Sequence, residues 1–185
     1  MRVIAGKARR ILLKSPKHFK TRPTSDRTKE TLFNVLQPII CGCTFLDLFS
    51  GTGGIGIEAL SRGANSCVFV DNDREAIRCI RENLEKTRLT AEGEIMARDA
   101  LSALRQLEGR ERFDCVFMDP PYDKELEKEV LTYLSTSKLL APGAWVVIEA
   151  SNQTDFDYLE ELGYNLIKEK QYKTNKHLFA ELREG

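Results

Sequence analysis

The sequence predicts an α/β fold with a mostly parallel seven-stranded sheet that finishes with an antiparallel strand at its carboxyl-terminal side. Short apolar runs alternate with amphipathic helical patterns along the middle of the chain, which is typical of βαβ units. A glycine-rich turn follows the first of these runs, and the last two runs are joined by a short connection. With 185 residues, the chain has the length of one domain whose core needs no disulfide or metal.

Residues 1–37 are predicted to form a small extension packed on the main domain, which spans residues 38–185. The first 14 residues contain two short apolar pieces around Gly6, the pattern of a β-hairpin. A helix is expected to start near residues 24–26, where three side chains are possible N-caps. Pro38 is expected to help end this helix.

The alternating region supplies most of the sheet. Its predicted strands are Thr44–Phe49, Cys67–Asp71, Glu94–Ala97, Phe113–Asp119 and Trp145–Ala150. The helical patterns between them are Ile55–Arg62, Arg74–Lys86, Leu101–Leu107 and Leu126–Leu134. This alternation predicts parallel strands covered by helices on both faces. After Gly163 two strands are expected to form an antiparallel pair, at Asn165–Glu169 and Leu178–Leu182.

Positive charge is concentrated at the amino terminus, although the chain as a whole is neutral. Residues 1–25 carry eight basic side chains and no acidic one, a net charge of +8. The other 160 residues carry 20 basic and 28 acidic side chains, a net charge of −8. A basic segment on an acidic body is typical of a protein that binds a polyanion. A solvated tail is the alternative interpretation.

The remaining composition excludes several classes of site. The five cysteines form no CxxC pair, and His18 and His177 lie far apart, so we expect no metal site. His177 is expected to be structural. No apolar run approaches the ~18 residues of a membrane span, and the amino terminus lacks the apolar stretch of a signal peptide. We therefore expect a cytoplasmic protein. We also expect it to be a monomer.

The glycine-rich turn predicts a cofactor site. Gly51, Gly53 and Gly56 satisfy the GxGxxG pattern between a predicted strand and a predicted helix. Glycines at these positions permit a tight turn and let a ligand approach the backbone, with helix N–H groups pointing at it. A plain connection between a strand and a helix is the alternative.

Three carboxylates, each at the end of a predicted strand, indicate which cofactor binds. Asp71 lies where a ribose diol would be held, and Asp99 with Ala100 lies where adenine would be held. Asp99 could equally be a helix N-cap. Together with Asp47, these acids favour S-adenosylmethionine (SAM) over NAD, whose pyrophosphate they would repel. The rest of the expected cofactor site is Phe49, Ser50, Gly51, Thr52, Gly53 and Asn72.

The tetrapeptide Asp119-Pro120-Pro121-Tyr122 is the predicted catalytic site. It follows a predicted strand, and the carboxyl ends of such strands form the ligand crevice. The Asp119 carboxylate and the Pro120 carbonyl can together accept both hydrogens of an exocyclic amine, while Tyr122 offers a ring for base stacking. Two acceptors that orient the nitrogen lone pair toward a methyl donor overcome its poor nucleophilicity. A proline-stiffened loop without chemistry is the alternative.

These motifs resemble the amino-group class of SAM-dependent methyltransferases, and more narrowly the bacterial RsmD-type 16S rRNA guanine-N2 methyltransferases. The resemblance spans nearly the whole chain and implies a Rossmann-like SAM methyltransferase fold. It is carried by Arg22-Pro23-Thr24 through Arg27, Glu30 and Phe33-Asn34, by the run Leu46–Ala64, and by Phe117–Tyr122. The departures are mild: Ser50 and Thr52 replace a common alanine and serine, and Asp71 replaces a frequent glutamate.

The resemblance implies transfer of one methyl group from SAM to N2 of a guanine, of the guanine 966 type, in 16S rRNA. The substrate would be an assembled or assembling small ribosomal subunit, with the base flipped into the tetrapeptide pocket. Arg9, Arg10 and Arg22 would contact phosphates. Thr24 would order the wall of the cofactor pocket, although a role as a plain N-cap is equally open.

Other functions are alternatives that share some of these features. An adenine-N6 or protein-glutamine methyltransferase would share the cofactor, but the glutamine enzymes usually carry Asn at the position of Asp119. An RNA-binding assembly factor without catalysis would predict a damaged tetrapeptide. An NAD oxidoreductase would need an acid–base group for hydride transfer, and neither histidine lies in such a motif.

Overall fold

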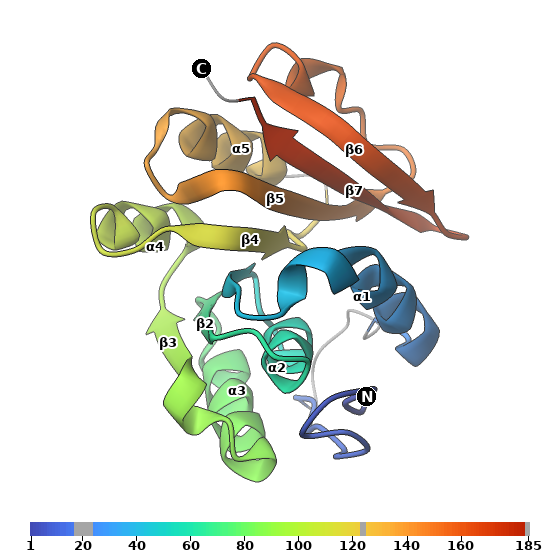
Figure 1. Ribbon diagram of the computed structural model, residues 1–185, viewed down its shortest axis with the longest axis vertical. Coiled ribbons are helices and arrows are strands. Elements are labelled where there is room, and N and C mark those ends of the chain that lie inside the picture. The colour runs from blue at the N-terminus through green and yellow to red at the C-terminus, as the bar shows by residue number, and fades with distance from the viewer. Residues whose placement is uncertain (17–23, 123–124, 184–185) are drawn as a thin grey trace.

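The computed structural model describes residues 1–16, 24–122 and 125–183, which are built around one seven-stranded sheet (Figure 1). The strands are β1 (Thr44–Leu48), β2 (Ser66–Asp71), β3 (Gly93–Ala97), β4 (Phe113–Met118), β5 (Leu140–Ser151), β6 (Tyr164–Gln171) and β7 (Asn175–Leu182). The α-helices are α1 (Asp26–Ile40), α2 (Gly54–Ser61), α3 (Arg74–Thr87), α4 (Ala100–Leu107) and α5 (Leu126–Thr136). Two short 3₁₀ helices, which the sequence did not predict, are η1 (Thr90–Glu92) and η2 (Asp157–Leu159).

The strand order confirms the predicted topology. The strands lie in the order β3-β2-β1-β4-β5-β7-β6, and neighbouring strands from β3 to β5 are parallel. β7 pairs antiparallel with both β5 and β6. Because the order reverses between β1 and β4, the carboxyl ends of these two strands border the crevice where ligands bind in open α/β sheets.

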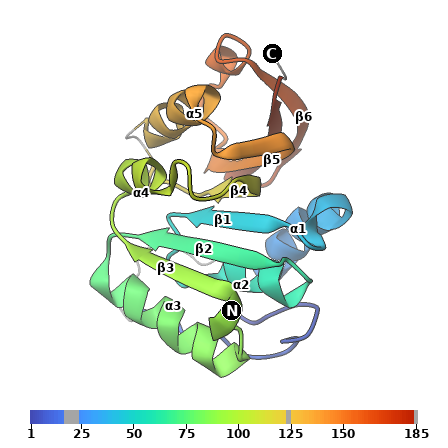
Figure 2. The ribbon, with the colours of Figure 1, turned by 60° about the vertical axis from the view of Figure 1, so that its left-hand side comes forward.

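Helices cover both faces of the sheet (Figures 1 and 2). A separate hydrophobic core lies beneath each set of helices. One core combines α1, α2 and α3 with strand residues such as Phe45, Phe69 and Phe117. The other combines α4 and α5 with Leu46, Val116 and other residues that alternate with the first set. Every residue of α2 is buried, because α1 and the amino-terminal segment lie over it.

The amino-terminal segment is a hairpin-shaped loop rather than the predicted β-hairpin. Only an isolated antiparallel bridge joins Arg2 to Leu12, with a few backbone hydrogen bonds beside it. The backbone groups near the tip bond to α2 instead: the amides of Ile4 and Ala5 donate to the Glu58 carboxylate. The strand pairing does not extend further because these two backbone amides are bonded to Glu58 of α2.

Two helix and strand boundaries also differ from the predictions. Helix α1 continues to Ile40, so Pro38 lies inside its last turn. A proline there costs one backbone hydrogen bond, and burial of Ile40 compensates. Strand β5 starts at Leu140 rather than Trp145, because a register shift opposite β4 accommodates the Pro142-Gly143 turn signal.

Two further observations concern the whole fold. None of the helices in the described ranges is long and apolar enough to cross a membrane. The division into residues 1–37 and 38–185 stays a prediction, and α1 runs across that boundary.

Candidate active site

The glycine-rich loop after β1 is a sharp turn fixed to the neighbouring strand. Phe49, Gly51 and Gly53 all have positive φ, at 60°, 56° and 75°. The Ser50 hydroxyl donates to the Asp47 carbonyl oxygen at 2.6 Å and accepts from the Val70 amide at 3.0 Å. The loop is therefore held in one conformation by β2 before any ligand arrives.

Gly56, the third glycine of the motif, lets α2 approach the sheet. A Cβ atom at this position would lie 2.4 Å from the Phe69 ring and 2.6 Å from the Cys67 sulfur. Close packing of the first helix on the sheet brings its amino-terminal N–H groups to the edge of the crevice. Thr52 is buried, and its hydroxyl accepts a hydrogen bond from the Gly54 amide at 3.3 Å.

Asp47 is buried beneath the start of α2, with its side chain 1% exposed. Its Oδ2 atom accepts a hydrogen bond from the Gly56 amide at 3.0 Å. Burial raises the pKa of Asp47 to about 7, and the bond from Gly56 opposes the shift. The carboxylate thus links β1 to α2 and places one acid under the loop that would face the cofactor.

Asp71 ties the end of β2 to the glycine-rich loop. Its Oδ2 atom accepts from the Gly51 amide at 2.8 Å, and its Oδ1 atom accepts from the Asp73 amide at 2.9 Å. Each carboxylate oxygen keeps a second lone pair, so this oriented acid can still accept the hydroxyls of a ribose. Asn72, which follows it, is exposed.

Asp99 is the N-cap of α4, one of the two roles expected for it. Its Oδ1 atom accepts from the Ser102 amide at 2.9 Å. Hydrogen bonding from the Ser102 side chain and, secondly, from the Ser102 amide lowers the pKa of the carboxyl. Ala100 is buried beside it. Asp99 nevertheless follows β3 at the same edge of the sheet as Asp47 and Asp71. The structure therefore places the three acids along one crevice.

The tetrapeptide predicted to be catalytic, Asp119–Tyr122, follows β4 at this same edge. Asp119 is partly exposed as a residue. Desolvation by the surrounding protein, together with the negative charges of Glu149 and Asp47, raises the pKa of its carboxyl well above the ordinary value. No described residue donates a hydrogen bond to this carboxylate. Pro120 is buried, whereas Pro121 and Tyr122 are exposed. An unbonded acid beside a rigid proline carbonyl can accept a hydrogen bond from a ligand.

The structure adds a buried acid that sequence analysis missed. Glu149 is 6% exposed at the end of β5, and its Oε2 atom lies 3.0 Å from Nε2 of His177 on β7. Asn175 donates to its Oε1 atom at 2.7 Å. The signal was present in the sequence, since Glu149 is a charged residue inside a buried apolar run. Its partners could not be identified, because they lie 26 and 28 residues further along the chain.

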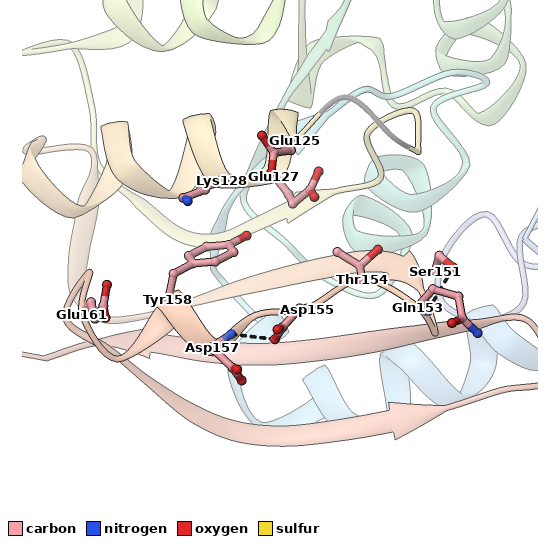
Figure 3. A pocket seen from close by; sticks show the side chains of 10 residues that line it. All are labelled: Glu125, Glu127, Lys128, Ser151, Gln153, Thr154, Asp155, Asp157, Tyr158 and Glu161. Carbon is pink, nitrogen blue, oxygen red and sulfur yellow. Dashed lines mark hydrogen bonds between the residues drawn. The ribbon is translucent and has the colours of Figure 1, made fainter.

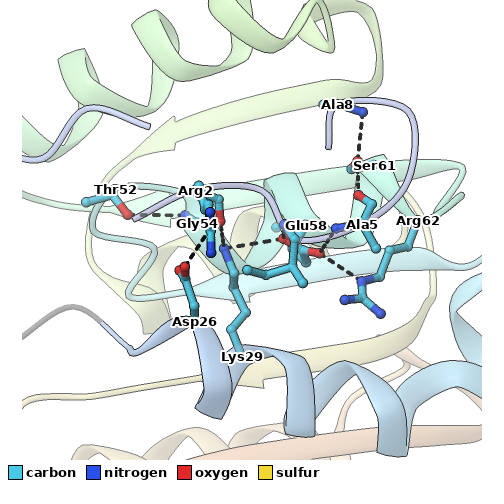
Figure 4. A network of polar contacts seen from close by, with 12 residues as sticks. Arg2, Ala5, Ala8, Asp26, Lys29, Thr52, Gly54, Glu58, Ser61 and Arg62 are labelled. Carbon is cyan, nitrogen blue, oxygen red and sulfur yellow. Dashed lines mark hydrogen bonds and ion pairs between the residues drawn. The ribbon is translucent and has the colours of Figure 1, made fainter. Parts of the chain in front are cut away.

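The basic amino-terminal segment is docked on the body by a buried polar network (Figure 4). Besides the two backbone amides, Glu58 pairs with Lys29 at 3.3 Å and with Arg62 at 2.8 Å. Burial lowers the pKa of Lys29, while the adjacent Glu58 carboxylate opposes that shift. Lys29 also donates to the Arg2 carbonyl. The network holds the segment against α1 and α2, so it is not a free tail over residues 1–14.

The basic side chains of this segment divide into two groups. Three of them pair with acids of the body: Arg2 with Asp26, Lys7 with Glu92 and Lys14 with Glu82, each at 2.8 Å. Arg9 and Arg10 are exposed and form no ion pair with a described residue. These two remain available for a polyanion.

Two further residues were predicted to belong to the site, Arg22 for RNA binding and Thr24 for the wall of the cofactor pocket. Arg22 lies outside the described residues. Thr24 is partly buried just before α1, but Ser25 is the N-cap, since its hydroxyl accepts from the Thr28 amide at 3.1 Å.

A groove of about 540 Å³ lies away from these carboxylates, between the start of α5 and the loop after β5 (Figure 3). Its lining includes five acidic side chains and one lysine: Glu125, Glu127, Asp155, Asp157, Glu161 and Lys128. A surface with this charge repels nucleic-acid phosphates. We assign the candidate site to the crevice around Asp47 and Asp119 instead, because the glycine-rich loop and the buried acids converge there.

Comparison with known proteins identifies the family. The family model described as conserved hypothetical protein 95 matches residues 1–181. The chain is 34% identical over 171 residues to ribosomal RNA small subunit methyltransferase D of Haemophilus influenzae, covering 92% of this chain and 88% of that protein. The chain belongs to this RsmD-type family. The resemblance inferred from the sequence motifs is confirmed.

Solved structures confirm the fold of this family member. The structure of yhhF from Escherichia coli superposes with a TM-score of 0.87 at 30% identity, covering 97% of this chain and 96% of that one. SMU.776, solved in complex with SAH, the demethylated product of SAM, superposes with a TM-score of 0.70. It is 14% identical and covers 86% of this chain and 50% of that one, so it supports the Rossmann-like fold alone.

Proposed function

We propose that this protein transfers a methyl group from SAM to the exocyclic N2 amine of a guanine in 16S rRNA. The observation that carries the proposal is the position of Asp119. This residue follows β4 beside the glycine-rich loop, and two prolines come directly after it. Its carboxylate has no hydrogen-bond donor among the described residues. The membership of the RsmD-type family supports rRNA as the substrate.

The residues of the crevice fit SAM. Asp71, oriented by two backbone amides, suits the ribose hydroxyls, and Asp99 with Ala100 suits adenine at the next strand end. The loop of residues 49–53 and Asp47 beneath it suit the methionine end, which carries an ammonium group. When bound, SAM supplies an electrophilic methyl group on a sulfonium.

The tetrapeptide accounts for methylation of an amine. A carboxylate and a proline carbonyl that accept its two N–H groups orient the nitrogen lone pair toward the methyl donor. Tyr122 is 50% exposed, so its ring can stack on a base that has been flipped out of the RNA. Adenine carries the same kind of amine, which makes an adenine-N6 product the competing outcome.

The basic segment accounts for RNA binding. Arg9 and Arg10 are exposed on a segment that is docked along α2 and whose tip contacts the carboxyl end of that helix. Lys173 is exposed and the Lys176 ammonium lies 5.5 Å from the centroid of the Phe156 ring, and neither is assigned to RNA in this proposal. The substrate is 16S rRNA within an assembled or assembling small subunit, of the guanine 966 type, and the enzyme acts as a cytoplasmic monomer.

The test is transfer of labelled methyl from SAM to small subunits and to naked 16S rRNA from cells that lack the protein. We expect N2-methylguanosine as the labelled nucleoside, at one position, with subunits preferred over naked RNA. An N6-methyladenosine product would replace the guanine assignment, and binding of both substrates without label transfer would favour the assembly-factor alternative.

A further inference from the structure

Three side chains stand at the same level on three neighbouring strands beside the catalytic loop. Met118 pairs with Ile148 in the parallel register of β4 and β5, so Asp119 and Glu149, the next residues, adjoin at the carboxyl end. Glu149 in turn pairs with His177 in the antiparallel register of β5 and β7. Residues paired across adjacent strands point to the same face of the sheet. A row therefore runs from Asp119 through Glu149 to His177.

The far end of this row is anchored. The Tyr172 hydroxyl lies 3.2 Å from Nδ1 of His177, and the His177 ring packs edge-on against Phe117 at 6.2 Å between centroids. His177 is fully buried. One partner on each ring nitrogen fixes the imidazole, and the fixed imidazole together with Asn175 fixes both oxygens of Glu149.

Burying one carboxylate beside another is costly, and such pairs are concentrated at functional sites. The acids that face Asp119 are Glu149 from β5 and Asp47 from β1, and Tyr122 faces it from its own loop. No basic side chain contributes to the environment of Asp119 among the described residues. The acids Asp119, Glu149 and Asp47 therefore lie close together. The Glu149 carboxylate is fixed by its contacts with His177 and Asn175.

We propose that Glu149, held by His177 and Asn175, is a positioning residue that makes Asp119 the acceptor of the proton released by the target amine. This inference rests on the proposed function. In the transfer step the target nitrogen bonds to the methyl carbon, while the carbon–sulfur bond breaks and its electron pair goes to sulfur. The nitrogen then carries a positive charge, and one of its protons passes to the Asp119 carboxylate. A neighbouring negative charge that cannot move away increases the proton affinity of that carboxylate.

The decisive variant is Glu149→Gln, which keeps the side-chain volume and one acceptor but removes the charge. Single-turnover methyl transfer to small subunits is measured against pH at saturating SAM. Without the Glu149 charge, Asp119 ionises at lower pH, so we expect the acid limb to move down by about one pH unit. A carboxylate of lower proton affinity is also a weaker hydrogen-bond acceptor for the N–H groups of the amine as it becomes positively charged, so the plateau rate should fall about threefold. The variant is then slower than the wild type at high pH but faster on the acid limb.

The positioning partners supply a second, independent measurement. His177→Ala should lower the plateau rate by up to about threefold with an unchanged KM for SAM, and His177→Gln, which retains a donor, should recover most of the loss. Asn175→Ala removes a half-buried donor with little risk to folding, and should lower the plateau rate severalfold. Glu169→Gln, which removes an exposed charge on β6, is the matched control and should reproduce the wild-type profile.

Different results would contradict the proposed methyl-transfer function and the proposed role of Glu149. If the wild type transfers no methyl group to the subunit, the proposed function is wrong. If the wild type is active and the folded Glu149→Gln protein has the wild-type acid limb, Glu149 has no influence on Asp119. If Glu149→Gln does not fold, a wild-type rate in Asn175→Ala would likewise overturn the inference.

Discussion

Gly6 lies so close to Ser61 that a Cβ atom at position 6 would fall 1.8 Å from the Ser61 carbonyl oxygen. The same carbonyl accepts a hydrogen bond from the Lys7 amide at 2.9 Å, and the Ser61 hydroxyl bonds to the backbone of Ala5 and Ala8. The tip of the basic segment is thus attached to the end of α2 by backbone contacts that depend on a residue without a side chain.

Gly6→Ala should detach this tip. The added methyl group clashes with backbone, and the φ of +80° adds strain, so we expect a loss of about 2–4 kcal/mol in the free energy of unfolding. Gly42→Ala is the matched control: its φ is +77°, but nothing lies within 4 Å of the added Cβ, so only the strain of about 1 kcal/mol applies. Denaturant titration compares the two, and equal losses would refute the packing argument.

Asp119→Asn should abolish methyl transfer without weakening SAM binding. The amide cannot take up the proton, and its N–H groups repel the target amine, so we expect a rate loss of at least about 100-fold. Calorimetry should give a wild-type Kd for SAM. Asp155→Asn, in the exposed loop after β5, controls for the removal of a charge. Substantial turnover by the Asp119 variant would remove the tetrapeptide from the mechanism.

We expect Asp71→Asn to weaken SAM binding and Asp99→Asn to leave the folding stability nearly unchanged. Asp71→Asn should raise the Kd about tenfold or more, because an amide accepts one ribose hydroxyl less well and also loses its bond to the Gly51 amide or the Asp73 amide. Asp99→Asn should leave folding stability nearly unchanged, since asparagine is an equally good N-cap. Isothermal calorimetry and thermal melting test both statements; a wild-type Kd for Asp71→Asn would exclude Asp71 from the ribose site.

Neutralising Arg9 and Arg10 together should weaken RNA binding and flatten its dependence on salt. For every phosphate that the variant no longer neutralises, the slope of log K against log salt should fall by about 0.7–0.9. Lys7→Gln serves as the control, because its ammonium group already pairs with Glu92. Filter binding over a salt series measures the slopes. If the double variant keeps the wild-type slope, these two arginines do not bind RNA phosphates.

Asp47 should make the protein less stable as the pH rises. Its folded pKa of about 7 lies above the unfolded value of 3.8, so the native state binds the extra proton between these values. The stabilisation is complete below about pH 4 and is lost as the pH rises through 7. Asp47→Asn should therefore gain stability over the wild type with rising pH, by at most about 4 kcal/mol. A pH-independent difference between the two proteins would contradict the burial of this charge.

The architecture of the main domain could be predicted from the amino-acid sequence. Alternation of apolar runs with helical patterns predicted the parallel strands from β1 to β5, and the change of pattern after Gly163 predicted the antiparallel finish. The three glycines and the tetrapeptide also lie where the motifs predicted, at the ends of β1 and β4. These features depend on residues close together in the chain, whose spacing is visible without a structure.

In contrast, the contacts between residues that are distant in the sequence depend on how the helices and strands pack together. The pairing of β5 with β7 brings His177 and Glu149 together, and a one-residue change in register would have separated them. The amino-terminal segment forms a loop instead of a strand ladder because Glu58 and Ser61 of α2 satisfy its backbone groups. Local spacing specifies helices, strands and turns, but packing between them determines which buried charges meet, and here it placed Glu149 beside Asp119.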